Sequence, residues 1–222
     1  MRMKEYNIIE DLENVITKYP TLKIEKRSGI LWLNGDFILL SPCGDHIDSF
    51  CISICFFNFP NQLPMVWENG GKIERIPDRH VYTNTNSLCL AVEPTALLIC
   101  NRGINALHFI EKILKPHLAM QAYFNLKGVY PTGEYKHGFK GILEYLSELL
   151  GTDNTKIIAS SINIAIENVR QKNHEPCYCG SRKKFKNCHL HPIKILRLLG
   201  NDKLEQYLKT IQEYGNKNNT NF

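Results

Sequence analysis

The sequence predicts an α/β protein of the α+β type, in which a helix packs on a curved antiparallel sheet of about four strands and further helices follow. Apolar residues recur at helical spacing near the start of the chain, and apolar and polar residues alternate in the segment that follows. Helical spacing returns after Pro94. The 222 residues are 43% hydrophobic and 22% charged, which is typical of a folded globular protein.

The first predicted elements are a helix and a hairpin. Apolar side chains at helical spacing predict a helix over 4–18, which Pro20 ends. Strands are predicted at 29–33 and 36–40 and are joined by Asn34-Gly35, because this dipeptide favours the tight turn of a hairpin.

The next part of the chain is predicted to hold one more strand and then irregular structure. The segment 41–45 has the composition of a turn, and alternation over 50–56 predicts a strand. Breakers at Pro60, Pro64 and Gly70-Gly71 predict irregular chain beyond it.

The second half of the chain is predicted to be mainly helical. Helices are expected at four places, the first kinked or broken at Pro116 and the last interrupted at Gly200: 106–121, 139–150, 156–170 and 192–214. From these elements we predict four segments: a domain over 1–150, a helical linker over 151–172, a compact Cys/His segment over 173–191 and a helical tail over 192–222.

Composition narrows the classes of function. The net charge of +5 is too small by itself to indicate a nucleic-acid partner. No apolar stretch approaches the roughly 18 residues of a membrane span, and acidic side chains stand where a secretory signal would be apolar. We therefore expect a cytoplasmic protein, away from membranes, whose eight cysteines stay reduced and serve metal binding, catalysis or packing.

The sharpest local signal lies between Glu175 and His189, where Cys-x-Cys is followed, after eight residues, by Cys-His. Soft and borderline ligands at this spacing predict a tetrahedral Zn²⁺ site, with His191 as a competing fourth ligand. The ligands that we assign are Cys177, Cys179, Cys188 and His189. The segment is too short and polar to fold on its own burial, so metal binding would supply the missing free energy.

This segment resembles the SEC-C motif. The resemblance implies a structural zinc knuckle used for docking, in which the metal has no catalytic role. Basic side chains surround the cysteines, at Arg182, Lys183, Lys184 and Lys186. They would contact an acidic protein or phosphates, or simply form a solvated face.

A second candidate site centres on Cys89. A polar loop at 83–87 separates this cysteine from His80, nine residues before it. A thiol in a partly exposed polar setting is a candidate nucleophile, although a cysteine between two leucines is also typical of a buried core position.

The order of these residues resembles that of ubiquitin-conjugating enzymes. Four residues match the aromatic-Pro-x-x-x-Pro-x-Val pattern of that family: Phe59, Pro60, Pro64 and Val66. The resemblance implies that Cys89 forms the thioester and that His80 is the motif histidine, with a mainly structural role. Val81-Tyr82 replaces the family's Pro-Asn, so Asn84 or Asn86 would have to supply the missing amide.

A bacterial branch of conjugating-enzyme-like proteins carries a turn similar to Gly133-Glu134-Tyr135-Lys136-His137-Gly138. The resemblance implies that Glu134 and His137 form a base or orienting pair near the thioester. The alternative is a turn that starts the helix at 139–150, with the acidic residue at its N-terminus.

We therefore expect a conjugating-enzyme-like fold over 1–150 and a thioester transferase. Its partners would be a ubiquitin-like modifier, an activating enzyme that performs the ATP chemistry, and an acceptor protein. The resemblance also implies a bacterial antiphage (antiviral) defence operon, with a cyclic-nucleotide synthase or a phage protein as acceptor, and Zn²⁺ as the one cofactor. The alternatives are a non-catalytic module that binds ubiquitin-like proteins and an adaptor that works through its zinc knuckle.

Overall fold

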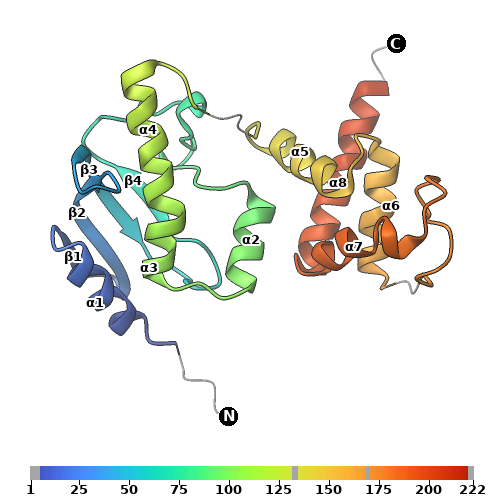
Figure 1. Ribbon diagram of the computed structural model, residues 1–222, viewed down its shortest axis with the longest axis horizontal. Helices are drawn as coiled ribbons and strands as arrows, with labels where there is room; N and C mark the ends of the chain where they lie inside the picture. Colours follow the sequence, from blue (N-terminus) through green and yellow to red (C-terminus); the bar gives the residue numbers. More distant parts are fainter. Residues whose placement is uncertain (1–5, 132–134, 169–170, 220–222) are drawn as a thin grey trace. The chain divides into compact units, whose positions relative to one another are not determined.

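The computed structural model describes residues 6–131, 135–168 and 171–219. It is a mixed α+β structure, and the chain forms two compact units (Figure 1). The first unit comprises 1–91 and 95–134, and the second comprises 92–94 and 135–222. The sequence predicts a first domain that extends to 150. Instead, the helix at 139–150 belongs to the second unit, where it contacts the next helix along the chain.

The first unit begins with a helix and a four-stranded sheet. Helix α1 (Ile8–Lys18) starts at Asn7, whose side chain accepts hydrogen bonds from the backbone N–H groups of residues 9 and 10. The antiparallel sheet has the order β1-β2-β3-β4, so each strand pairs with the next along the chain. The strands are β1 (Leu22–Arg27), β2 (Ile30–Leu40), β3 (His46–Cys55) and β4 (Met65–Glu68).

Helices follow the sheet. A short 3₁₀ turn, η1 (Pro77–Arg79), leads toward Cys89, and helix α2 (Glu93–Asn101) follows it. A long helical stretch then combines α3 (Ala106–Phe109), the π-helical turn η2 (Ile110–Leu114) and α4 (Lys115–Lys127). Pro116 does not break this stretch; it directly follows the π-helical turn η2, where the N–H of Lys115 donates five residues back, to the carbonyl oxygen of Ile110.

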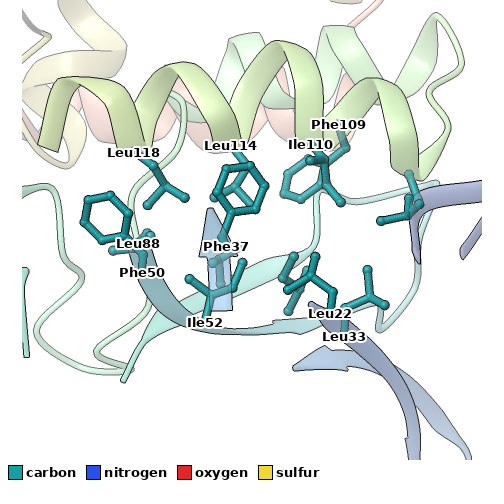
Figure 2. Packing of buried hydrophobic residues seen from close by; sticks show 14 of the residues in the cluster. Leu22, Leu33, Phe37, Phe50, Ile52, Leu88, Phe109, Ile110, Leu114 and Leu118 are labelled. Carbon is teal, nitrogen blue, oxygen red and sulfur yellow. The ribbon is translucent and has the colours of Figure 1, made fainter. Parts of the chain in front are cut away.

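The core of the first unit lies between one face of the sheet and the α3–α4 stretch (Figure 2). Apolar side chains from both layers are fully buried there, including Leu33, Phe37, Phe50 and Ile52 from the sheet and Phe109, Ile110, Leu114 and Leu118 from the helices. Leu88 enters the same core, so the residue before Cys89 is anchored by burial.

The prediction of a turn at Asn34-Gly35 is wrong. Strand β2 runs through both residues, and the hairpin turns at Ser28 and Gly29, which both have positive φ angles (48° and 84°). Gly35 serves another purpose: a Cβ atom there would lie 2.2 Å from the carbonyl oxygen of Thr21. The glycine is needed because the chain passes close to it at Thr21, just before the start of β1.

The second unit is helical in its described part. It contains α5 (Phe139–Leu150), α6 (Thr155–Ile166), the 3₁₀ turn η3 (Phe185–Asn187), α7 (Leu190–Arg197) and α8 (Asn201–Asn219). Helix α5 has the predicted bounds, and the interruption predicted at Gly200 separates α7 from α8. Throughout 6–131, 135–168 and 171–219, no helix is both long and apolar enough to cross a membrane.

Candidate functional site

Cys89 lies on a short two-stranded ribbon that brings it next to His80. Val81 and Leu88 form a β-bridge, and the backbone N–H of Cys89 donates to the carbonyl oxygen of His80 at 2.6 Å. The ribbon is attached to the sheet, because the N–H of Leu88 donates to the carbonyl oxygen of Val66 in β4 at 2.7 Å. The nine-residue separation in sequence thus becomes direct contact between the two backbones.

The side chains of the two residues are also close. A ring nitrogen of His80 and the Sγ atom of Cys89 lie within 4.8 Å of each other, and both residues are half-buried. Cys89 is thus only partly buried and lies beside an imidazole, an arrangement compatible with a nucleophile.

The ring of His80 rests on two other aromatic side chains. It meets His117 and Tyr130 edge-on, with ring centroids 6.0 Å and 5.4 Å away. Burial, with a smaller effect from His80, lowers the pKa of His117 to about 3, so this second imidazole is neutral at physiological pH. His80 therefore rests against a neutral ring.

The loop between His80 and Cys89 is closed by its own hydrogen bonds. The N–H of Tyr82 donates to the carbonyl oxygen of Ser87 at 2.9 Å, and the N–H of Asn86 donates back to that of Tyr82 at 2.7 Å. Asn84 and Asn86 are exposed on this loop, and Asn86 has a positive φ of 57°. Their proposed role at the thioester stays a prediction.

Sequence reasoning missed a side chain that fastens this loop. Trp67 in β4 donates its ring N–H to the carbonyl oxygen of Thr85 at 2.9 Å, and it stacks on Trp32 with centroids 5.6 Å apart. No local sequence signal marks this contact, because the partners are 18 residues apart and the acceptor is a backbone atom.

His137 belongs to the second unit, where it lies exposed in the segment that leads into α5. Its predicted partner Glu134 lies outside the described residues. The proposed role of this pair is therefore still a prediction.

The second unit contains the Cys/His cluster expected from the sequence. The ligand atoms of Cys177, Cys179, Cys188 and His189 all lie within 4.8 Å of one another. The two Sγ atoms of Cys179 and Cys188 are 3.6 Å apart, close to the roughly 3.7 Å that tetrahedral zinc–thiolate geometry requires. The Nδ1 atom of His189 is 3.1 Å from the Cys188 sulfur and 3.3 Å from the Cys177 sulfur.

The surroundings of the cluster fit a metal ion. The Nε2 atom of His189 lies 3.0 Å from the carbonyl oxygen of Leu150, so Nδ1 faces the three sulfurs as a ligand. Ser181 places its hydroxyl 3.2 Å and 3.4 Å from two of the sulfur atoms. His191 is exposed on α7 and lies outside the cluster, which favours His189 as the fourth ligand.

The backbone around the cluster forms a compact knuckle. Pro176 and Lys184 form a β-bridge, and the N–H of Cys177 donates to the carbonyl oxygen of Lys183 at 2.8 Å. Gly180 takes the positive φ of 77° that the turn after the first two cysteines needs. Burial raises the pKa of the Cys177 thiol to about 11, so binding of a metal there must release a proton.

Comparison with known proteins identifies one motif. The model of the SEC-C motif matches residues 175–190, the segment that forms the knuckle. No curated protein and no solved structure matches the chain. The family match thus covers the Cys/His cluster and does not extend to the unit that carries Cys89.

Proposed function

We propose that this protein carries a ubiquitin-like modifier as a thioester on Cys89 and transfers it to an acceptor protein. The observation that carries the proposal is the half-exposed thiol of Cys89 beside the imidazole of His80. The order of elements supports it: a helix, a four-stranded antiparallel meander, a ribbon with histidine and cysteine, and then helices. This order is similar to that of ubiquitin-conjugating enzymes.

The chemistry needs little from the chain besides the thiol and its placement. The Cys89 thiolate attacks the carbonyl carbon of the modifier's thioester on the activating enzyme, and the thiolate of that enzyme leaves. One carbon–sulfur bond forms and one breaks, with no oxidation or reduction. An acceptor amine later displaces Cys89 and gives an amide, and the amine's proton passes to solvent or to a nearby base.

Each predicted residue has a role in this mechanism. His80 orients the ribbon, and Asn84, Asn86 and backbone N–H groups are the candidates for stabilising the tetrahedral oxyanion. His137 stays a candidate base or orienting residue. In the second unit, Cys177, Cys179, Cys188 and His189 would hold a structural Zn²⁺, whose contribution is to fold a basic docking knuckle.

The setting that we propose is bacterial antiphage defence. It follows from the resemblance to bacterial conjugation systems, in which the acceptor would be a cyclic-nucleotide synthase or a phage protein. The alternative is a binding module in which Cys89 is inert and the knuckle, with its exposed Arg182, Lys183, Lys184 and Lys186, recruits an acidic partner.

A thioester trap tests the proposal. We would co-express the chain with the proteins encoded beside its gene and measure intact masses under denaturing, non-reducing conditions. We expect a protein-sized adduct on the wild type that dithiothreitol removes, a dithiothreitol-resistant ester in Cys89→Ser, and no adduct in Cys89→Ala. Cys43→Ser is the matched control, since Cys43 is an exposed thiol in a turn and should leave the adduct unchanged.

Two results together would contradict the carrier mechanism. They are the absence of any adduct with a demonstrably active partner set, and a Cys89 thiol that resists alkylation in the folded protein. The binding-module alternative would then stand.

A further inference from the structure

Arg79, the residue before His80, is a cation buried beneath the ribbon. Only 6% of its surface is exposed. Its Nε and Nη2 atoms donate to the side-chain oxygen of Gln121 at 3.1 Å and 2.9 Å, and Nη2 also donates to that of Asn125 at 2.6 Å. The guanidinium lies 4.3 Å from the ring centroid of Phe124. Among the residues that the structure describes, its partners are all uncharged.

A buried cation whose partners among the described residues are all neutral is unfavourable, so its presence needs a physical reason. Apolar packing alone would be achieved better by a neutral side chain. What the guanidinium provides here is a planar set of donors that meets two amide oxygens on successive turns of α4. It therefore fixes the residue before His80 to one helix of the core.

Gln121 completes this attachment from the helix side. It is fully buried, and its side-chain N–H donates to the backbone carbonyl oxygen of Arg79 at 3.1 Å. A single amide thus holds both ends of Arg79, the guanidinium through its oxygen and the backbone through its nitrogen. The same nitrogen lies 3.5 Å from the ring of His117, against which His80 packs.

The backbone that is held in this way leads directly to the thiol. His80 has the left-handed conformation (φ 51°, ψ 48°), which is unfavourable for a residue with a Cβ atom unless its surroundings enforce it. Its N–H donates to the carbonyl oxygen of Pro77 at 2.8 Å, and its own carbonyl oxygen accepts the N–H of Cys89. Two hydrogen bonds, joined by the covalent backbone of residues 79 and 80, therefore connect Gln121 with Cys89.

We propose that Arg79 and Gln121 are positioning residues that hold the left-handed turn at His80 and thereby set the Cys89 thiol against the imidazole. The positioning effect is a property of the folded first unit. Its consequence for thioester formation rests on the function proposed above.

Hydrogen exchange of the Cys89 amide tests the positioning effect without any conjugation partner. In Arg79→Met, we expect this amide to exchange about tenfold faster, while amides of β2 and β3 keep their protection. Arg75→Met is the matched control, because it removes an exposed cation from the same segment and should leave both rates unchanged.

Gln121→Glu separates positioning from simple stability. A glutamate at this place gives the guanidinium a carboxylate partner, but it loses the N–H that holds the Arg79 carbonyl oxygen. We expect an unchanged or higher unfolding midpoint together with faster exchange at Cys89. Arg79→Lys keeps the charge and should not restore slow exchange, because an ammonium group cannot meet the two amide oxygens in one plane.

Two results would overturn the proposal. In one, Cys89 exchange stays at the wild-type rate in Gln121→Glu and in folded Arg79→Met. In the other, exchange rises equally in β2 and β3, which indicates general destabilisation. If the thioester trap succeeds, Arg79→Met should also slow loading about tenfold at saturating donor, with the half-saturating donor concentration unchanged. Selective exchange in the variants, together with no wild-type adduct from an active partner set and a Cys89 thiol that resists alkylation, would uphold the positioning effect and reject the carrier function.

Discussion

At the scale of single residues, Gly35 allows the observed register of β1 and β2 because glycine has no Cβ atom. It has a φ of 143°, and a Cβ atom would meet the carbonyl oxygen of Thr21 at 2.2 Å. We expect Gly35→Ala to lower the free energy of unfolding of the first unit by about 3 kcal/mol, because backbone atoms must shift to relieve the contact. Urea denaturation followed by tryptophan fluorescence measures it, since both tryptophans, Trp32 and Trp67, lie in this unit.

Gly44→Ala is the matched control for this prediction. Gly44 also has a positive φ, 91°, but a Cβ atom there would meet nothing within 4 Å. The backbone conformation alone should cost about 1 kcal/mol. Equal losses in the two variants would show that the contact with Thr21 has no part in the stability of the hairpin.

Single residues also show what a sequence can and cannot predict about a site. The four residues of the Cys/His cluster lie within 13 positions, so their spacing alone predicts that they meet. The separation of nine positions and the polar loop at 83–87 predict that His80 and Cys89 lie close together, and the ribbon does bring their backbones into contact. Arg79 and Gln121 are 42 residues apart, and their contact depends on how α4 crosses the sheet, which no local pattern encodes.

At the scale of elements, the hairpin between β1 and β2 shows tertiary packing overriding a local signal. Asn34-Gly35 has the preferred composition of a tight turn, yet the turn forms at Ser28-Gly29. The observed register pairs Leu22 with Gly35, and it sends Leu33 and Phe37 of β2 into the core together. A two-residue turn at Asn34-Gly35 would instead place Trp32 opposite Phe37, so Leu33 and Phe37 would point to opposite faces of the hairpin.

Short strands are harder to predict than long helices, because a short segment shows too little of its periodic pattern. Strand β4 has four residues and begins directly after Pro64, so alternation has no length over which to show itself. Helix α5 was predicted with its observed bounds, because it has a clear apolar face and ends at Gly151, which takes a left-handed conformation. Periodicity over twelve residues is a signal that four residues cannot give.

The observed turn leads to a prediction for this hairpin. Ser28 adopts a φ of 48°, which asparagine tolerates better than serine, and Gly29 already suits the second position. We expect Ser28→Asn to raise the unfolding free energy of the first unit by about 0.5 kcal/mol, and Ser28→Val to lower it by more than that. Tryptophan fluorescence in urea again measures both, and a loss of stability in Ser28→Asn would argue against the turn as described.

At the scale of the whole molecule, the chain divides the two candidate chemistries between its two units. The first unit has its own apolar core, both tryptophans and Cys89, whereas the second has the Cys/His cluster and three of the eight cysteines. Residues of the knuckle also contact two helices of the second unit, α5 and α6. His189 reaches the carbonyl oxygen of Leu150 at the end of α5, and the Tyr178 hydroxyl lies 2.6 Å from that of Ser161 in α6.

Removal of the metal should therefore loosen the second unit and spare the first. Metal binding supplies on the order of 10 kcal/mol of folding free energy in comparable zinc peptides. This is as large as the whole free energy of unfolding of a typical small domain. With one Zn²⁺ bound per chain, a strong chelator or Cys177→Ser should remove much of the helical circular dichroism and leave the tryptophan unfolding midpoint unchanged. Cys43→Ser should have neither effect. If chelation shifted the tryptophan midpoint by the same amount as the helical signal, the two units would unfold as one, and the stability of the Cys89 ribbon would itself depend on the metal.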